Sequence, residues 1–104
     1  MNIIHILHLY SEEVAAIVKS GDMVSILECQ KSLEIDKIFA RKAIQLALVD
    51  PSGMSEAWIK DHKVLLGYGD LLLLERHISN IQFRLDWTLL RLRSKSIVQA
   101  IVRR

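Results

Sequence analysis

The sequence predicts an all-α protein, a single-domain helical bundle of about five helices over residues 1–104 with a long C-terminal core helix. Three observations support this fold class. Apolar residues recur at steps of three and four in every long segment, as one face of a helix requires, and no segment alternates as a half-buried strand would. One Pro and four Gly leave little chain for loops. A length of 104 residues suffices for one hydrophobic core and not for two.

The first half of the chain predicts three amphipathic helices, over residues 2–19, 22–32 and 33–49. Ser20-Gly21 interrupts the apolar pattern, and Asp22 is a suitable N-cap for the helix that follows. No Gly or Pro separates the second helix from the third. The sequence therefore leaves open whether these two helices are continuous.

A fourth helix is predicted over residues 55–66. The preceding Asp50-Pro51-Ser52-Gly53 is a turn, because the residue before Pro avoids the helical region and the other three residues favour turns. Ser55 would cap this helix, and Gly67-Tyr68-Gly69 would end it. The residues that we expect it to bury are Trp58, Ile59 and either Leu65 or Leu66.

The fifth helix, over residues 70–103 with Asp70 as its N-cap, is the expected core of the fold. Two apolar series follow it at steps of three and four. The first runs through Leu71, Leu74, Ile78, Ile81, Leu85, Leu89 and Leu92. The second runs through Phe83, Trp87, Leu90, Ile97 and Ile101. Because the two series leave the helix axis in different directions, one neighbouring helix cannot cover both.

Two turns in the chain resemble each other. Lys19-Ser20-Gly21-Asp22 and Gly67-Tyr68-Gly69-Asp70 each read as a small-residue turn followed by an Asp cap and a helix. Whether they belong to a true two-unit repeat stays open, because this capping solution is common.

The composition favours a globular protein in a reducing compartment. The chain is 51% hydrophobic and 25% charged, and its single Cys29 cannot form an intramolecular disulfide. No uncharged run is long enough to span a membrane, and the opening residues lack the basic start and cleavage site of a signal peptide. We therefore expect a cytoplasmic protein without a membrane span. A mean hydropathy of +0.24 is high for a small monomer and indicates a surface that meets a partner.

The charge of the chain is unevenly distributed. The net charge is +2, yet residues 1–40 carry three bases and six acids, whereas residues 84–104 carry six bases and only Asp86 as an acid. Arg84, Arg91 and Lys95 are therefore candidate contacts to phosphate groups or to an acidic partner. A nucleic-acid-binding protein that uses this basic helix is one alternative function.

No motif for catalysis, cofactor binding or metal binding is recognisable, so we expect no enzyme, no cofactor and no metal site. His5, His8 and Glu12 share one helix face and could approach a metal, but a fourth ligand would have to come from His62, His77 or Cys29. The acids Asp36, Asp61 and Asp86 are isolated in helical patterns and are expected on solvated faces. An enzyme whose site is not visible as a motif remains the second alternative.

The preferred function is a helical protein–protein interaction module, such as an adaptor, a regulator, a chaperone-like binder or an assembly subunit. Its partner would be a second copy of the chain or a foreign protein. The residues expected to bind it are the second apolar series of the last helix: Phe83, Trp87, Leu90, Ile97 and Ile101. Aromatic and aliphatic residues rimmed by arginine are typical of interface cores.

Overall fold

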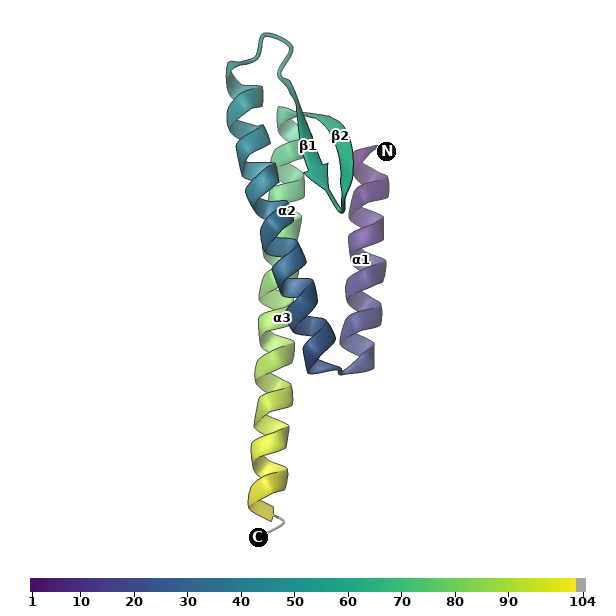
Figure 1. The fold of residues 1–104 in the computed structure, drawn as a ribbon, viewed down its shortest axis with the longest axis vertical. Helices are drawn as coiled ribbons and strands as arrows, with labels where there is room; N and C mark the ends of the chain where they lie inside the picture. The colour runs from purple at the N-terminus through teal and green to yellow at the C-terminus, as the bar shows by residue number, and fades with distance from the viewer. Residues whose placement is uncertain (103–104) are drawn as a thin grey trace.

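Three helices and one β-hairpin make up the computed structural model, which describes the backbone of residues 1–102 and the side chains of residues 1–95 (Figure 1). In chain order the elements are α1 (Ile3–Ser20), α2 (Met23–Val49), β1 (Met54–Ile59), β2 (His62–Gly67) and α3 (Tyr68–Val102). α2 and α3 run in opposite directions and pack along each other, while α1 lies to one side and the hairpin lies between α1 and α2. The molecule is elongated, at 65 × 21 × 18 Å.

The predicted five-helix, all-α bundle is wrong in two places. Residues 22–32 and 33–49 form one helix, α2, and residues 55–66 form most of a β-hairpin instead of a helix. The first difference follows from the absence of any Gly or Pro near residue 32. One buried face continues across this point at steps of three and four, through Ile26, Cys29, Leu33, Asp36, Ala40, Ala43 and Ala47.

The hairpin is a tight antiparallel pair in which Ile59 lies opposite His62. Lys60 and Asp61 form its turn, with φ of 51° and 63°, the left-handed backbone that a two-residue hairpin turn requires. One face of the hairpin buries Ala57, Ile59, Val64 and Leu66. Because side chains alternate between the faces of a strand, Trp58 and Leu65 point to solvent, so the prediction that this segment buries Trp58 is wrong.

The start of α3 also differs from the prediction. The helix begins at Tyr68, so Asp70 lies inside its first turn and is not the N-cap. An acid there still interacts favourably with the positive end of the helix dipole. Gly21 ends α1 in the left-handed region, whereas Gly67 ends a strand, so the two similar turns occupy different structures and are not a repeat. The Asp22 cap is confirmed, since its Oδ1 accepts a hydrogen bond from the Val24 amide at 3.3 Å.

The core lies between the helices and under the hairpin. The first apolar series of α3 is buried as expected, from Leu71 to Leu89, with Leu92 half-buried at its end. Towards the C-terminal end of α2 the buried residues are small: Ala40, Ala43 and Ala47. β1 packs against α2. Beside this core, side chains of α2 bond to α3, as in the 3.2 Å pair between Arg41 Nη2 and Glu75 Oε1.

None of the helices within residues 1–102 contains a stretch that is both long enough and apolar enough to cross a membrane.

Gly21→Ala is expected to lower the free energy of unfolding by about 1–2 kcal/mol, the cost of a left-handed backbone at a residue with a Cβ. The φ of Gly21 is +65°, and no atom lies within 4 Å of an added Cβ, so the cost is conformational and not steric. Gly69→Ala is the matched control. That glycine lies in the first turn of α3 with equally open surroundings, so alanine should leave stability unchanged or raise it by up to about 1 kcal/mol. Urea denaturation followed by circular dichroism measures the free energy of unfolding of both variants. Equal effects of the two changes would contradict a left-handed backbone at Gly21.

Candidate functional site

An apolar stripe lies on the outer face of α3, where no other element of the described chain covers it. It consists of Phe83, Trp87 and Leu90, which are 65%, 59% and 55% exposed. Their steps of four and three place them on one face of the helix. Leu85 and Leu89, on the opposite face, are buried against the rest of the fold. We call these three residues the α3 stripe.

The two aromatic residues of the α3 stripe contact each other edge to face. Their ring centroids are 6.3 Å apart and their planes make an angle of 76°. This is one of the geometries that aromatic pairs prefer. Phe83 and Trp87 therefore form a joined apolar surface and not two isolated exposed rings.

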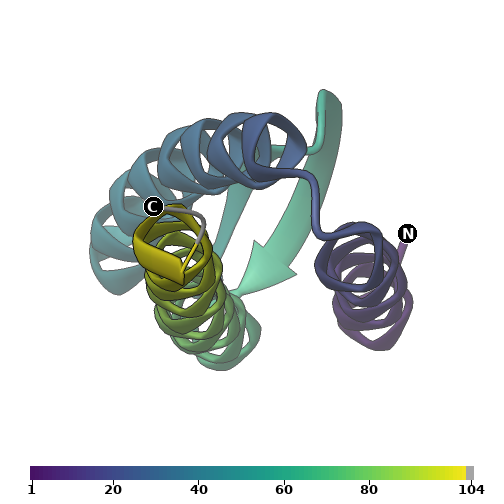
Figure 2. The same cartoon turned by 90° about the horizontal axis from the view of Figure 1, so that it is seen from below.

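A groove of about 650 Å³ borders the α3 stripe, between the last turns of α1 and the second half of α3. It is lined by Val18, Arg84, Trp87, Thr88, Leu90, Arg91 and Ser94. Figure 2 shows the arrangement from below: α2 and α3 pack along each other, α1 lies to one side and also contacts α3, and the hairpin lies behind them. We call this feature the α1–α3 groove.

Two arginines stand in the α1–α3 groove, Arg84 and Arg91, two helical turns apart. In the part of the chain whose side chains are described, neither guanidinium takes part in an ion pair. The structure thus brings together two of the basic residues singled out from the sequence with two members of the apolar series. Lys95 is exposed further along α3, while the side chains of Ile97 and Ile101 lie outside the described residues.

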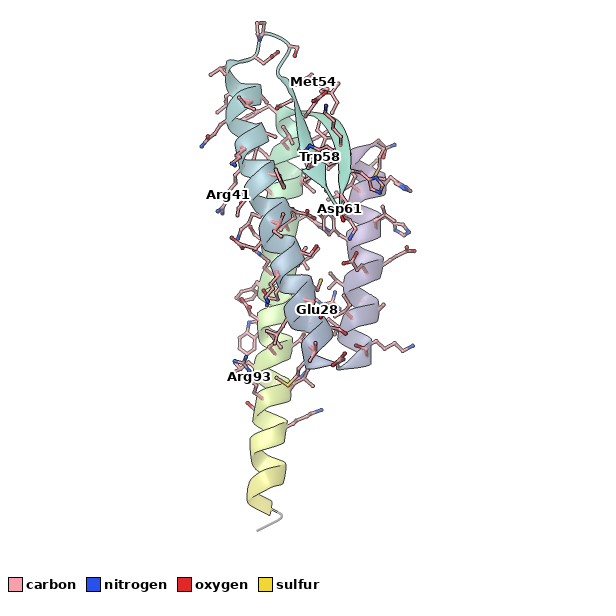
Figure 3. The ribbon with its side chains drawn as sticks, in the orientation of Figure 1. Glu28, Arg41, Met54, Trp58, Asp61 and Arg93 are labelled. Carbon is pink, nitrogen blue, oxygen red and sulfur yellow. The ribbon has the colours of Figure 1, made fainter. Side chains whose placement is uncertain are left out.

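A second cluster, which sequence reasoning missed, anchors the hairpin turn between α1 and α2. The Tyr10 hydroxyl donates a hydrogen bond to Asp36 Oδ2, and the Lys60 amide donates one to Asp36 Oδ1 at 3.3 Å. Lys60 Nζ pairs with the Glu13 carboxylate and lies 4.8 Å from the centroid of the Tyr10 ring. In Figure 3 the labelled Asp61 marks the turn, which points between the two helices. We call Tyr10, Glu13, Asp36 and Lys60 the turn cluster.

Burial dominates the electrostatics of the turn cluster. It raises the pKa of Asp36 above the usual 3.8, although the hydrogen bonds from Tyr10 and Lys60 act in the opposite direction. Burial, followed by the hydrogen bond to Asp36 and the charge of Asp36, also raises the pKa of the Tyr10 hydroxyl far above its ordinary value. The prediction that Asp36 lies on a solvated face is wrong, since only 5% of this residue is exposed.

Two further titratable residues lie beside the turn cluster. Cys29 Sγ lies 3.9 Å from Glu13 Oε1 as a weak donor, and burial raises the pKa of its thiol. The His77 ring meets the Tyr10 ring edge to face at 6.2 Å, and burial lowers the pKa of its imidazole. Among the described side chains, His77 Nε2 is buried without a hydrogen-bond partner. None of the residues that line the α1–α3 groove belongs to the turn cluster. The hydrogen bonds of the turn cluster connect α1, α2 and the hairpin turn.

The candidate metal ligands do not converge. His5 and His8 are exposed on α1, where His8 Nε2 lies 3.0 Å from Glu12 Oε1 and the two can form a surface ion pair when the imidazole is protonated. Within the described side chains, no group of three or more His, Cys, Asp or Glu residues is placed to hold a metal ion.

Comparison with known proteins gives no match to this chain among protein-family models, curated proteins or solved structures. The fold is helix-dominated, with three helices and one two-stranded antiparallel sheet in the described residues. The features that indicate a function are the α3 stripe, the α1–α3 groove and the two arginines that line it.

Proposed function

We propose that this protein is a helical protein–protein interaction module that binds its partner through the α3 stripe. The single observation that carries the proposal is the exposure of Phe83, Trp87 and Leu90 on a helix whose opposite face is fully used by the core. Scattered exposed apolar residues are normal on a surface, but an aligned aromatic pair with a leucine is a contiguous patch. Patches of this kind mark interaction sites.

The composition of the surface around the stripe supports the same function. Interface cores are enriched in aromatic residues and arginine and depleted in acids, and their rims are polar. Trp87 lines the α1–α3 groove together with Arg84 and Arg91, and the exposed Ser94 contributes a hydroxyl group. The hydroxyl of the buried Thr88 instead donates a hydrogen bond to the Arg84 carbonyl. The proposed partner is a protein, either a second copy or a foreign chain, and the proposed location is the cytoplasm.

Trp87→Ala is expected to weaken association by about 2 kcal/mol or more, as truncation of a central interface tryptophan does, while the helix content of the isolated protein is kept. Trp58→Ala is the matched control, because Trp58 is the other tryptophan and is 50% exposed on the hairpin, outside the α3 stripe. Sedimentation over a range of concentrations measures self-association, and capture from cell extract with both variants side by side measures foreign partners.

The proposal would be contradicted if the protein sediments as a strict monomer and if Trp87→Ala and Trp58→Ala capture the same proteins. Association lost in Trp58→Ala alone would move the interface to the hairpin, whose outer face also presents Met54 and Leu65.

One observation favours a second candidate function, nucleic-acid binding. Arg84, Arg91 and Trp87 line the same groove, and bases stack on aromatic rings while arginines neutralise phosphates. Such binding should fall steeply as salt is raised and should depend on both arginines. Failure of a labelled single strand and a labelled duplex to bind at low salt would eliminate this candidate.

A further inference from the structure

We infer that the partner is an amphipathic α-helix whose apolar face is flanked by acidic residues, and that it docks along α3 in the α1–α3 groove. The inference rests on the proposed function and adds the chemistry of the partner to it. Two features of the described residues specify that chemistry: the charge of the groove and the helical spacing of the α3 stripe that borders it.

The charge of the groove is positive and is not neutralised from within the described chain. Arg84 and Arg91 line it, and no ion pair among the described side chains engages either one. The only acid on α3 between residues 84 and 95 is Asp86, whose Oδ1 accepts a hydrogen bond from Gln30 of α2 at 2.6 Å. That bond directs the carboxylate toward α2 and away from the groove. A partner with carboxylates would supply the missing counter-charges.

The spacing of the α3 stripe, which borders the groove, matches the repeat of a helix. Phe83, Trp87 and Leu90 follow the i, i+4, i+7 pattern by which one helix meets another. Arg84 and Arg91 are seven residues apart, a separation of about 10 Å along α3. Acids seven residues apart on a docked helix recur at the same distance. A helix in this position would lie against both α3 and the end of α1, where Val18 lines the groove.

A second copy of the chain fits this surface less well. If two copies paired by a two-fold axis centred on the α3 stripe, antiparallel α3 helices would bring Arg84 of one copy within a turn of Arg91 of the other. Parallel α3 helices would place each arginine beside the same arginine of the other copy. Both arrangements set like charges against each other, which opposes self-pairing and favours a foreign acidic helix.

The test uses two synthetic helical peptides and the full chain. Both peptides, about 20 residues long, carry leucines at the i, i+4, i+7 spacing, and they differ only in the flanking positions, which are Glu in one and Gln in the other. In a Trp58→Phe background, Trp87 is the only tryptophan, so its emission reports docking directly. We expect the Glu peptide to bind at least about tenfold more tightly than the Gln peptide, with a difference that shrinks as salt is raised.

Variants of the chain locate the effect. Arg84→Gln combined with Arg91→Gln should weaken binding of the Glu peptide about tenfold and leave the Gln peptide unaffected. Lys31→Gln combined with Lys42→Gln is the control, since it removes the same charge from exposed positions of α2 and should change binding less than about twofold. Circular dichroism checks that both double variants keep their helix content.

Each of the other outcomes overturns the inference in a recognisable way. Equal binding of both peptides, abolished by Trp87→Ala, would leave the proposed function standing and remove the acidic partner. Failure of the Glu peptide together with dimers that depend on Trp87 would make the occupant a second copy. Failure of both peptides together with binding of a labelled single strand that depends on Arg84 and Arg91 would overturn the inference and the proposed function alike.

Discussion

Leu85→Ala is expected to lower the free energy of unfolding by about 2–5 kcal/mol, whereas Leu90→Ala in the same helix should lower it by less than about 1 kcal/mol. The two residues share a type and a helix and differ in their surroundings, since Leu85 is 0% exposed and Leu90 is 55% exposed. Truncating Leu85 removes apolar contacts and leaves a cavity between the helices, whereas truncating Leu90 leaves its site to water. Urea denaturation followed by far-ultraviolet circular dichroism measures both values.

The comparison also tests which of the two apolar series of α3 supports the fold. Similar losses for the two variants would mean that the second series is part of the monomer's core, and the α3 stripe would then not be a free surface. A loss for Leu90→Ala that depends on protein concentration would instead indicate self-association, because dissociation then accompanies unfolding.

Asp36→Ala is expected to lower the free energy of unfolding by about 3 kcal/mol. The Tyr10 hydroxyl and the Lys60 amide would both lose the acceptor that Asp36 provides, and a buried donor without a partner costs about 1–3 kcal/mol. Asp86→Ala is the control, because Asp86 is an exposed acid on α3 and its loss should cost about 0.5 kcal/mol. Equal effects of the two changes would show that the turn cluster does not hold the hairpin in place.

The same cluster gives a pH dependence with a defined sign. Burial raises the folded-state pKa of Asp36 above 3.8, so the folded protein holds this proton more tightly than the unfolded chain does. The stability contributed by this proton is fully present below pH 3.8 and is lost as the pH rises through the raised pKa of Asp36. Asp36→Asn has no such proton. The stability of the wild type relative to Asp36→Asn should therefore decline as the pH rises across this window.

The difference between the two proteins is the quantity to measure, because carboxylates common to both largely cancel in it. Urea denaturation at a series of pH values gives this difference directly. A difference that stays constant, or one that grows in favour of the wild type as the pH rises, would contradict the raised pKa.

The helical part of the fold could be predicted from the sequence because its signals are local. Steps of three and four identify the faces of α1, α2 and α3, and Gly21-Asp22 and Asp50-Pro51 mark where helices end. The hairpin could not be predicted in this way. Its turn, Lys60-Asp61, lacks the Asn-Gly or Asp-Gly pair that usually signals left-handed backbone, and only Ala57, Ile59, Val64 and Leu66 record the alternation.

The turn cluster was missed for a related reason. Asp36 occupies a position in the buried series of α2, between Leu33 and Ala40, and an acid at such a position could have signalled a buried polar site. Its partners are not recoverable from the sequence, because Tyr10 and Lys60 lie far from it along the chain. The exposure of Phe83, Trp87 and Leu90 was easier to predict from the sequence. The core of a small domain covers one apolar face of a helix, so the second apolar series of α3 was expected at the surface.

The order of the elements along the chain has a consequence for synthesis. α3 packs against α1, α2 and β2, yet it is the last of them to leave the ribosome. Until its buried residues emerge, the inner faces of α1 and α2 lack the helix that they pack against in the finished protein. The nascent chain therefore presents apolar helix faces throughout the translation of α1, α2 and the hairpin, the condition in which partly made chains aggregate or engage chaperones. Completion of α3 buries these faces together. We therefore expect α1, α2, the hairpin and α3 to fold late and in one concerted step.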